Sequence, residues 1–163
     1  MRNPEDSAVG PVFELINQLQ ATHQSVRSAA AEELGHVGSP AAVPPLLQAL
    51  RDADGDVRCN AARALGEIGC DDAVPSLTAA LADEDDAVRT WVTYGLGLLG
   101  AVSPLVDALR DPSWSVRARA AAALGELGAK AREAIPALEV VLEDGHTQVR
   151  QSALKSLELL RES

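Results

Sequence analysis

Two cysteines supply the most reactive side chains in this sequence. Cys59 lies one helical turn before Arg63, and a neighbouring guanidinium could lower the pKa of its thiol, although Asp56 and Glu67 oppose that effect. No histidine is spaced to form a dyad with this cysteine, so the sequence does not support nucleophilic catalysis. Cys59 and Cys70 have the spacing of neither a disulfide framework nor a metal site.

A run of aspartates is the second candidate for chemistry. Asp52-Ala-Asp54-Gly-Asp56 looks like the opening of a calcium loop, but the sixth position lacks the required glycine. Arg63 also stands where a bidentate glutamate would be needed. The run is therefore interpreted as an acidic turn between two helices, and we predict no metal site, no cofactor and no catalytic residue.

Composition and charge restrict the partners. The chain has 163 residues and a net charge of −10, without the basic stripe that nucleic acid or an anionic membrane would require. No apolar stretch approaches the roughly 20 residues that span a bilayer, and no secretory signal is visible, so a cytoplasmic protein is expected. Aromatic residues make up 2% of the chain, so the core must consist of Leu, Ala, Val and Ile, a composition that favours closely packed helices.

An internal repeat provides the elements that must position these side chains. A Val-Arg dipeptide recurs five times at intervals of about thirty residues. The five copies are Val26-Arg27, Val57-Arg58, Val88-Arg89, Val116-Arg117 and Val149-Arg150. A leucine lies eight residues after each valine. In the first four copies, glycines lie nine and twelve residues after the valine.

Each repeat is predicted to form two helices. The first contains a proline in its opening turn, and the second begins near Asp54, Asp85 or Ser113, which are good N-cap residues. The later glycine suits a left-handed C-terminal cap, and the earlier one indicates that a neighbouring helix packs very close. Stacked hairpins would share one continuous core, so we expect an all-α, right-handed α-solenoid of about five hairpins. Residues 1–10 are expected to be a flexible segment and 11–163 a single solenoid, with units at about 11–38, 41–69, 72–100, 102–128 and 132–161.

At these residues the chain resembles HEAT repeats, in particular the phycobilisome-lyase HEAT-like type. The resemblance rests on Pro75…Asp83…Val88-Arg89 and on Pro136…Asp144…Val149-Arg150. In that family the aspartate and the arginine hydrogen-bond within and between neighbouring repeats. The resemblance thus implies a partly buried structural ladder in which Asp52, Asp83, Asp111 and Asp144 pair with Arg58, Arg89, Arg117 and Arg150.

The resemblance also defines the enzymatic alternatives. Bilin lyase subunits are built from this repeat, but they are usually longer and work in pairs. HEAT-like deoxyhypusine hydroxylases hold iron with His-Glu dipeptides, whereas His23, His36 and His146 are followed here by Gln, Val and Thr. HEAT-like DNA glycosylases are basic, and this chain is acidic.

A binding surface is predicted on the concave side, which second helices line in HEAT stacks. Three of the four aromatic residues lie between residues 91 and 114, and exposed aromatic clusters typically form interfaces. The predicted partner-binding residues are Tyr94, Leu98, Trp114, Thr90, Ala118, Arg63 and Trp91. An alternative role for Trp91 is to fill space in the irregular third unit.

The preferred function is a non-catalytic scaffold or adaptor that binds a protein or peptide on the concave face. The alternative is a bilin lyase-like or chromophore-handling accessory subunit. A monomer or a weak homo-oligomer, associating through the apolar floor, is expected.

Overall fold

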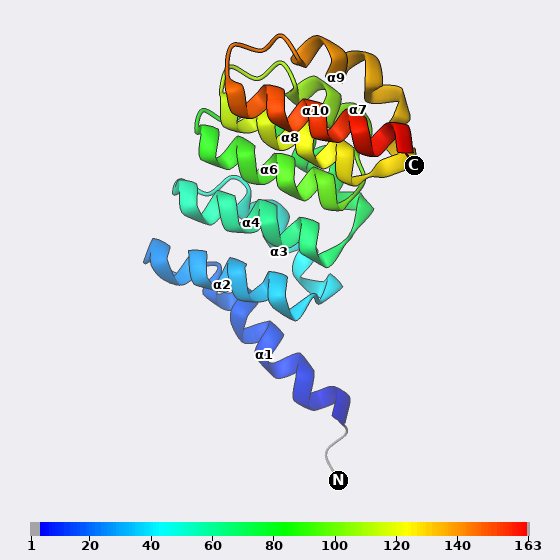
Figure 1. Cartoon of the computed structure of the whole chain (residues 1–163). Coiled ribbons are helices and arrows are strands. Elements are labelled where there is room, and N and C mark those ends of the chain that lie inside the picture. The colour runs from blue at the N-terminus through cyan, green and yellow to red at the C-terminus, as the bar shows by residue number, and fades with distance from the viewer. Residues whose placement is uncertain (1–3, 163) are drawn as a thin grey trace.

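The structure, a computed structural model, describes residues 4–162, in which ten α-helices form five hairpins (Figure 1). The first helices of the hairpins are α1 (Pro4–Gln18), α3 (Val43–Ala49), α5 (Val74–Ala80), α7 (Val102–Ala108) and α9 (Ile135–Val141). The second helices are α2 (Gln24–Val37), α4 (Gly55–Ile68), α6 (Asp86–Leu98), α8 (Trp114–Glu126) and α10 (Thr147–Glu162). Short 3-10 turns precede three of the first helices, η1 (Pro40–Ala42), η2 (Asp71–Ala73) and η3 (Gly128–Ala134).

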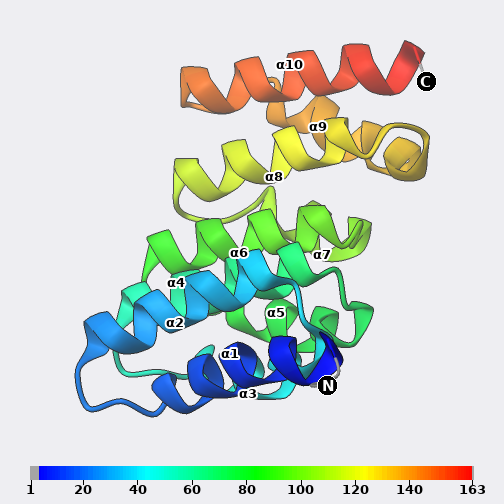
Figure 2. The same cartoon turned by 90° about the horizontal axis from the view of Figure 1, so that it is seen from below.

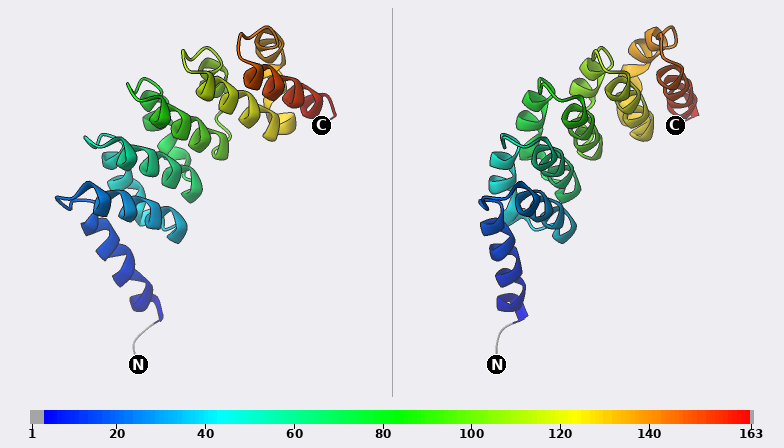
Figure 3. Two further views of the ribbon diagram at one scale, coloured as in Figure 1. Left: turned by 60° about the vertical axis from the view of Figure 1, so that its left-hand side comes forward. Right: turned by 90° about the vertical axis from the view of Figure 1, so that its left-hand side faces the viewer.

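The hairpins stack in chain order. Helices α2, α4, α6, α8 and α10 lie side by side in one layer, and the first helices of the hairpins form the other (Figure 2). The stack bends into an arc with the second helices on its inner side (Figure 3). The predicted all-α solenoid of five helical hairpins is therefore confirmed.

Local sequence signals set the ends of the helices. Pro75 lies in the first turn of α5, where the N–H that it lacks would be unpaired in any case. The Asp54 side chain accepts hydrogen bonds from the backbone N–H groups of Asp56 and Val57 and so caps α4. Gly69 ends the same helix with φ of 74°, a left-handed conformation that glycine adopts without strain. Ser113 occupies the predicted N-cap position of α8, but its hydroxyl makes no capping bond.

The core is a column of leucines and small residues between the two layers. The leucine eight residues after each Val-Arg valine is buried in every unit, and Leu65 and Leu96 have no exposed surface. Glycine keeps the second helices close together: a Cβ added to Gly66 of α4 would lie 2.6 Å from the Gly95 Cα of α6. The close approach predicted from the earlier glycine of each unit is therefore confirmed.

The first helix begins earlier than expected. Pro11 predicts a boundary at residue 11, since proline commonly opens a helix, but α1 begins at Pro4 and contains Pro11 in its interior. Residues 4–10 are therefore helical, and residues 1–3 of the expected flexible segment lie outside the described residues. Pro11 is exposed, so its ring meets solvent rather than a neighbouring helix, and the proline does not mark the start of α1.

Candidate protein-binding face

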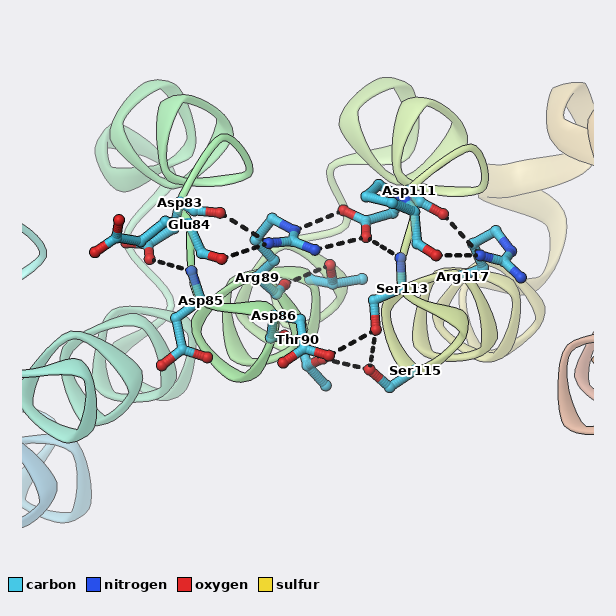
Figure 4. A network of polar contacts seen from close by, with 12 residues as sticks. Asp83, Glu84, Asp85, Asp86, Arg89, Thr90, Asp111, Ser113, Ser115 and Arg117 are labelled. Carbon is cyan, nitrogen blue, oxygen red and sulfur yellow. Dashed lines mark hydrogen bonds and ion pairs between the residues drawn. The ribbon is translucent and has the colours of Figure 1, made fainter.

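A ladder of arginine–aspartate pairs joins neighbouring units. Each arginine donates one hydrogen bond from Nε and one from Nη2 to the two oxygens of a single carboxylate, with Nε–Oδ2 distances of 2.7 or 2.8 Å. The pairs are Arg27–Asp52, Arg58–Asp83, Arg89–Asp111 and Arg117–Asp144. Such two-point contacts fix orientation as well as distance. Figure 4 shows the centre of the ladder.

Each arginine also clamps the turn of its own unit. Nη1 of Arg89 donates to the backbone carbonyl of Asp83 at 2.8 Å, and the backbone N–H of Asp85 donates to Oδ1 of Asp83 (Figure 4). The predicted partners are therefore wrong by one unit. Within its own unit the arginine donates to backbone carbonyls, those of Asp83 and Glu84 in the case of Arg89, because its Nε–Nη2 edge faces the carboxylate of the next unit.

The two ends of the ladder differ from its middle. Arg27, which the predicted ladder does not include, pairs with Asp52, although the first unit has Ala21 where the other units have an aspartate. Arg150, at the other end, donates to the Asp144 carbonyl and to Oγ1 of Thr147 and has no carboxylate partner among residues 4–162. The charged side chains of the ladder thus bind one another and join neighbouring units, which is a structural role.

The ladder also lowers the pKa of several of its aspartates. Hydrogen bonds from Arg27 keep the pKa of Asp52 below its ordinary value, and Arg117 does the same for the pKa of Asp144. At Asp83, burial raises the pKa, but hydrogen bonds from Arg58 and from the backbone outweigh it, so the pKa is again lowered. These carboxylates stay ionised at neutral pH.

We expect acid to destabilise the solenoid through these pairs. Because the folded-state pKa of Asp52, Asp83 and Asp144 lies below the ordinary value of 3.8, the pairs contribute their full stability above that value. The contribution is lost as pH falls through 3.8 toward the folded-state pKa. Urea unfolding at a series of pH values measures this loss. In the variant Asp52→Asn the free energy of unfolding should depend less steeply on pH in the acid range. An unchanged slope would contradict the assignment.

Cys59 does not face the groove. Its side chain is buried, and burial, with the nearby acidic residues, raises the pKa of the thiol to about 11. Arg63 therefore does not lower the pKa of this thiol, in line with the sequence, which did not support nucleophilic catalysis. The Arg63 guanidinium instead lies 2.9 Å from Glu32 and 3.8 Å from Glu67.

The inner face carries a strip of two aromatic rings between two guanidinium groups, which we call the aromatic strip and which is formed by Arg63, Trp91, Tyr94 and Arg119. Trp91 and Tyr94 meet edge to face, with ring centroids 5.6 Å apart. Arg63 lies 5.8 Å from the ring centroid of Trp91, and Arg119 lies 5.6 Å from that of Tyr94. This aromatic strip crosses α4, α6 and α8 and brings three of the predicted residues together.

Arg119 was not among the predicted binding residues. It occupies the same repeat position as Trp91, three residues after the Val-Arg valine, which the concave-face pattern left out. Trp91 is 38% exposed, so part of its ring lies on the surface. Position three of the repeat thus belongs to the inner face in the third and fourth units.

A small cavity lies beside the aromatic strip. Its volume is about 220 Å³, and it opens between α6 and α8. Leu98, 49% exposed, lies on its α6 side. The lining residues are Tyr94, Gly97, Leu98, Arg119, Ala123, Glu126 and Leu127.

Trp114 lies apart from this cavity. It begins α8 and stacks on His146, with ring centroids 4.2 Å apart. The Ser113 hydroxyl donates to Asp86 at the start of α6, and Tyr94 comes eight residues later, roughly 12 Å along that helix. The predicted floor therefore divides into an aromatic strip and a separate Trp114–His146 stack.

Two further predicted residues have internal roles. Ala118 is buried under the inner face, so it is not available as part of an apolar floor. Thr90 donates to the Asp86 carbonyl and lies 3.2 Å from the Ser115 hydroxyl, which links α6 to α8 (Figure 4). Ala118 thus packs inside the stack, and Thr90 joins two neighbouring second helices.

Two other kinds of feature, a metal site and a membrane-spanning helix, are not found in the described part of the chain. Among residues 4–162, no group of three His, Cys, Asp or Glu side chains is placed to hold a metal ion. None of the helices described has both the length and the apolar character needed to cross a membrane.

Five stacked hairpins joined by an arginine–aspartate ladder define an α-helical repeat protein. The chain belongs to the HEAT repeats family, whose model matches residues 13–97 and 102–163. This match and the likeness described next confirm the predicted resemblance to HEAT repeats of the phycobilisome-lyase type.

The solved structures similar to this chain include the complex of CpcE and CpcF of phycocyanin lyase from Nostoc sp. PCC7120. The identity is 31% and the TM-score 0.79, over 93% of this chain and 65% of that one. The chain therefore spans less than two thirds of that relative. A designed armadillo repeat protein in complex with a (KR)4 peptide, 22% identical with a TM-score of 0.66 over 93% of this chain and 82% of that one, shares the fold. Among curated proteins, none matches this chain.

Proposed function

We propose that this chain is a non-catalytic interaction module that holds a partner protein or peptide against its second helices. The observation that carries the proposal is the exposed aromatic strip with Leu98 beside it. Trp91 and Leu98 are 38% and 49% exposed, whereas the large apolar side chains of the core are buried. Exposed aromatic and arginine side chains that lie together are the residue types that dominate binding energy in interfaces.

The inner position of the strip strengthens this proposal. It lies on the concave layer of second helices, where one ligand can touch several units at once (Figure 3). Arg63 and Arg119 hold the rings from both sides, which reduces the side-chain entropy lost on binding. Preorganised aromatic groups on a rigid stack support a binding role.

We expect Trp91→Ala together with Tyr94→Ala to weaken partner binding by at least 2 kcal/mol, about thirtyfold, because these rings would be the anchors. The measurement is affinity capture from the native host by the wild-type chain, followed by titration of the captured protein against each variant. Phe13→Ala is the matched control, since Phe13 is 63% exposed on α1 and lies away from the strip. A partner that binds the double variant and the wild type equally would show that the strip is not the binding site.

A second candidate is a chromophore-handling accessory subunit of the lyase type. The 31% identity to the phycocyanin lyase complex supports it, as does the presence of paired arginine and aromatic groups on one face. Mixing the purified chain with a bilin tests it directly. A shift in the pigment's absorption that the Trp91→Ala, Tyr94→Ala variant abolishes would favour this role, and an unchanged spectrum would exclude it.

A further inference from the structure

The inner face has a notch in its fourth unit. Six residues after the Val-Arg valine, each second helix presents a side chain toward the concave side, and in four units that side chain is long. The fourth unit has an alanine instead. The five residues are Glu32, Arg63, Tyr94, Ala122 and Lys155. The surface is therefore lower over α8 than over the helices beside it.

Apolar side chains and cavities border this notch. Leu98 on α6 and Leu159 on α10 are 49% and 40% exposed and stand at the same repeat position on either side of α8. A cavity of about 220 Å³ lies between α6 and α8, and one of about 350 Å³ lies between α8 and α10. Glu126 lines both cavities, so they adjoin. We call this hollow, floored by Ala122 and bordered by Leu98 and Leu159, the α8 trough.

The width of the α8 trough matches one helix. Packed helices lie about 8–10 Å apart, so the axes of α6 and α10 are roughly 16–20 Å apart across α8. An α-helix with its side chains is about 10–12 Å wide. A partner helix can therefore lie between Leu98 and Leu159, and the single methyl group of Ala122 lets it approach α8 closely.

The charges of the α8 trough differ from those of the whole chain. The chain carries a net charge of −10, yet Arg119 and Lys155 stand at the trough with no carboxylate within ion-pair distance in residues 4–162. Glu126 is the carboxylate in both cavity linings and lies nearer the C-terminal end of α8. The trough thus presents two cations without an ion pair toward one end and a carboxylate toward the other.

We propose that the α8 trough seats one amphipathic α-helix of a partner protein, with acidic side chains against Arg119 and Lys155. Apolar side chains of that helix lie between Leu98 and Leu159. Its N-terminus faces Glu126 and its C-terminus faces Arg119, because the helix dipole is positive at the N-terminus and negative at the C-terminus. The partner helix therefore runs antiparallel to α8. This inference rests on the proposed function and specifies the chemistry of the partner.

Two synthetic peptides test the charge preference. Both are helix-constrained, have the length of α8 and share one apolar face; one carries glutamates and the other lysines at the positions facing Arg119 and Lys155. We expect the glutamate peptide to bind the full chain at least tenfold more tightly, measured by fluorescence anisotropy. In the variant Arg119→Glu, Lys155→Glu the order of the two affinities should reverse. Equal binding of both peptides, or no reversal, would overturn the proposal.

A steric test uses the notch itself. Ala122→Trp fills the α8 trough and should weaken binding of the glutamate peptide at least tenfold. Ala79→Trp on α5 is the matched control, since Ala79 is exposed on the other layer of helices and this change should leave the affinity unchanged. The charge reversal above does not depend on Ala122→Trp folding normally. Undiminished binding to a folded Ala122→Trp variant would contradict a helix in the trough.

Capture from the host separates this inference from the proposed function. A captured partner that is lost with Trp91→Ala, Tyr94→Ala but retained by both trough variants would overturn the helix and leave the binding role standing. A partner retained by all of these variants would overturn both. If the wild-type chain dimerises and Ala122→Trp prevents it, the occupant is a second copy of this chain, and the proposal of a foreign helix fails.

Discussion

Replacing Arg89 with alanine should lower the free energy of unfolding by about 3–5 kcal/mol, the usual cost of breaking a buried ion pair from one side. Arg89 donates two hydrogen bonds to Asp111 and one to the Asp83 carbonyl. The side chains of Arg89 and Asp111 are 11% and 8% exposed, so water cannot replace the guanidinium fully. The variant would leave the Asp111 carboxylate buried and without its counter-ion.

Arg150→Ala provides the matched control for this prediction. Arg150 stands at the same repeat position, but among residues 4–162 it donates only to the Asp144 carbonyl and to Oγ1 of Thr147. Its loss should cost about 1 kcal/mol, because neutral acceptors are left behind rather than a buried charge. Urea unfolding of both variants followed by circular dichroism gives the two costs. Equal costs would mean that pairing between units contributes no stability.

Gly66→Ala is expected to destabilise the chain although alanine is the better helix former. In an exposed helix the change would gain about 1 kcal/mol. Here the added Cβ would lie 2.6 Å from the Gly95 Cα and 3.1 Å from the Gly95 carbonyl oxygen. Backbone atoms cannot rotate aside as a side chain can, so α4 and α6 must separate. Overpacking of this kind costs about 1–3 kcal/mol, and we expect the net effect to be a loss.

Gly145→Ala is the control for Gly66→Ala. Gly145 lies exposed in the turn before α10, it is not among the glycines with positive φ, and a Cβ added there would meet nothing within 4 Å. This change should therefore stabilise the chain by about 0.4–1 kcal/mol, because the Cβ restricts the unfolded chain. Thermal unfolding compares the two, with roughly 2–4 °C expected for each kcal/mol in a chain of this size. A rise in melting temperature for both variants would contradict the close contact between α4 and α6.

Much of the fold could be predicted because its signals are local and repeated. The N-cap of Asp54, the turn at Gly69 and the proline at Pro75 each act within a few residues, and every unit repeats the pattern. The exception is Pro11, where one local signal had no repeat to confirm it and the true helix begins at Pro4. A pattern that recurs in five units is strong evidence for the helix boundaries. A single proline is weaker evidence, because proline occurs inside a helix as well as at its start.

The ladder shows where the repeat stops being informative. The sequence identified its aspartates and most of its arginines, but spacing along the chain could not distinguish a partner in the same unit from one in the next. The direction of the Arg58 side chain decides this, since its Nε–Nη2 edge faces Asp83 of the following unit. Side-chain direction depends on how neighbouring hairpins are offset, which is a property of the stack.

The binding face was predicted only in part for the same reason. The sequence alone determined the class of fold, the layer of second helices and the placing of Tyr94 and Leu98 on one side of their helix, because helical periodicity fixes which residues share one side of a helix. Only the tertiary structure separated Trp114 from Tyr94, buried Ala118 and brought Arg119 against the Tyr94 ring. These contacts depend on the offset between adjacent hairpins, and no single repeat encodes the distance to its neighbour.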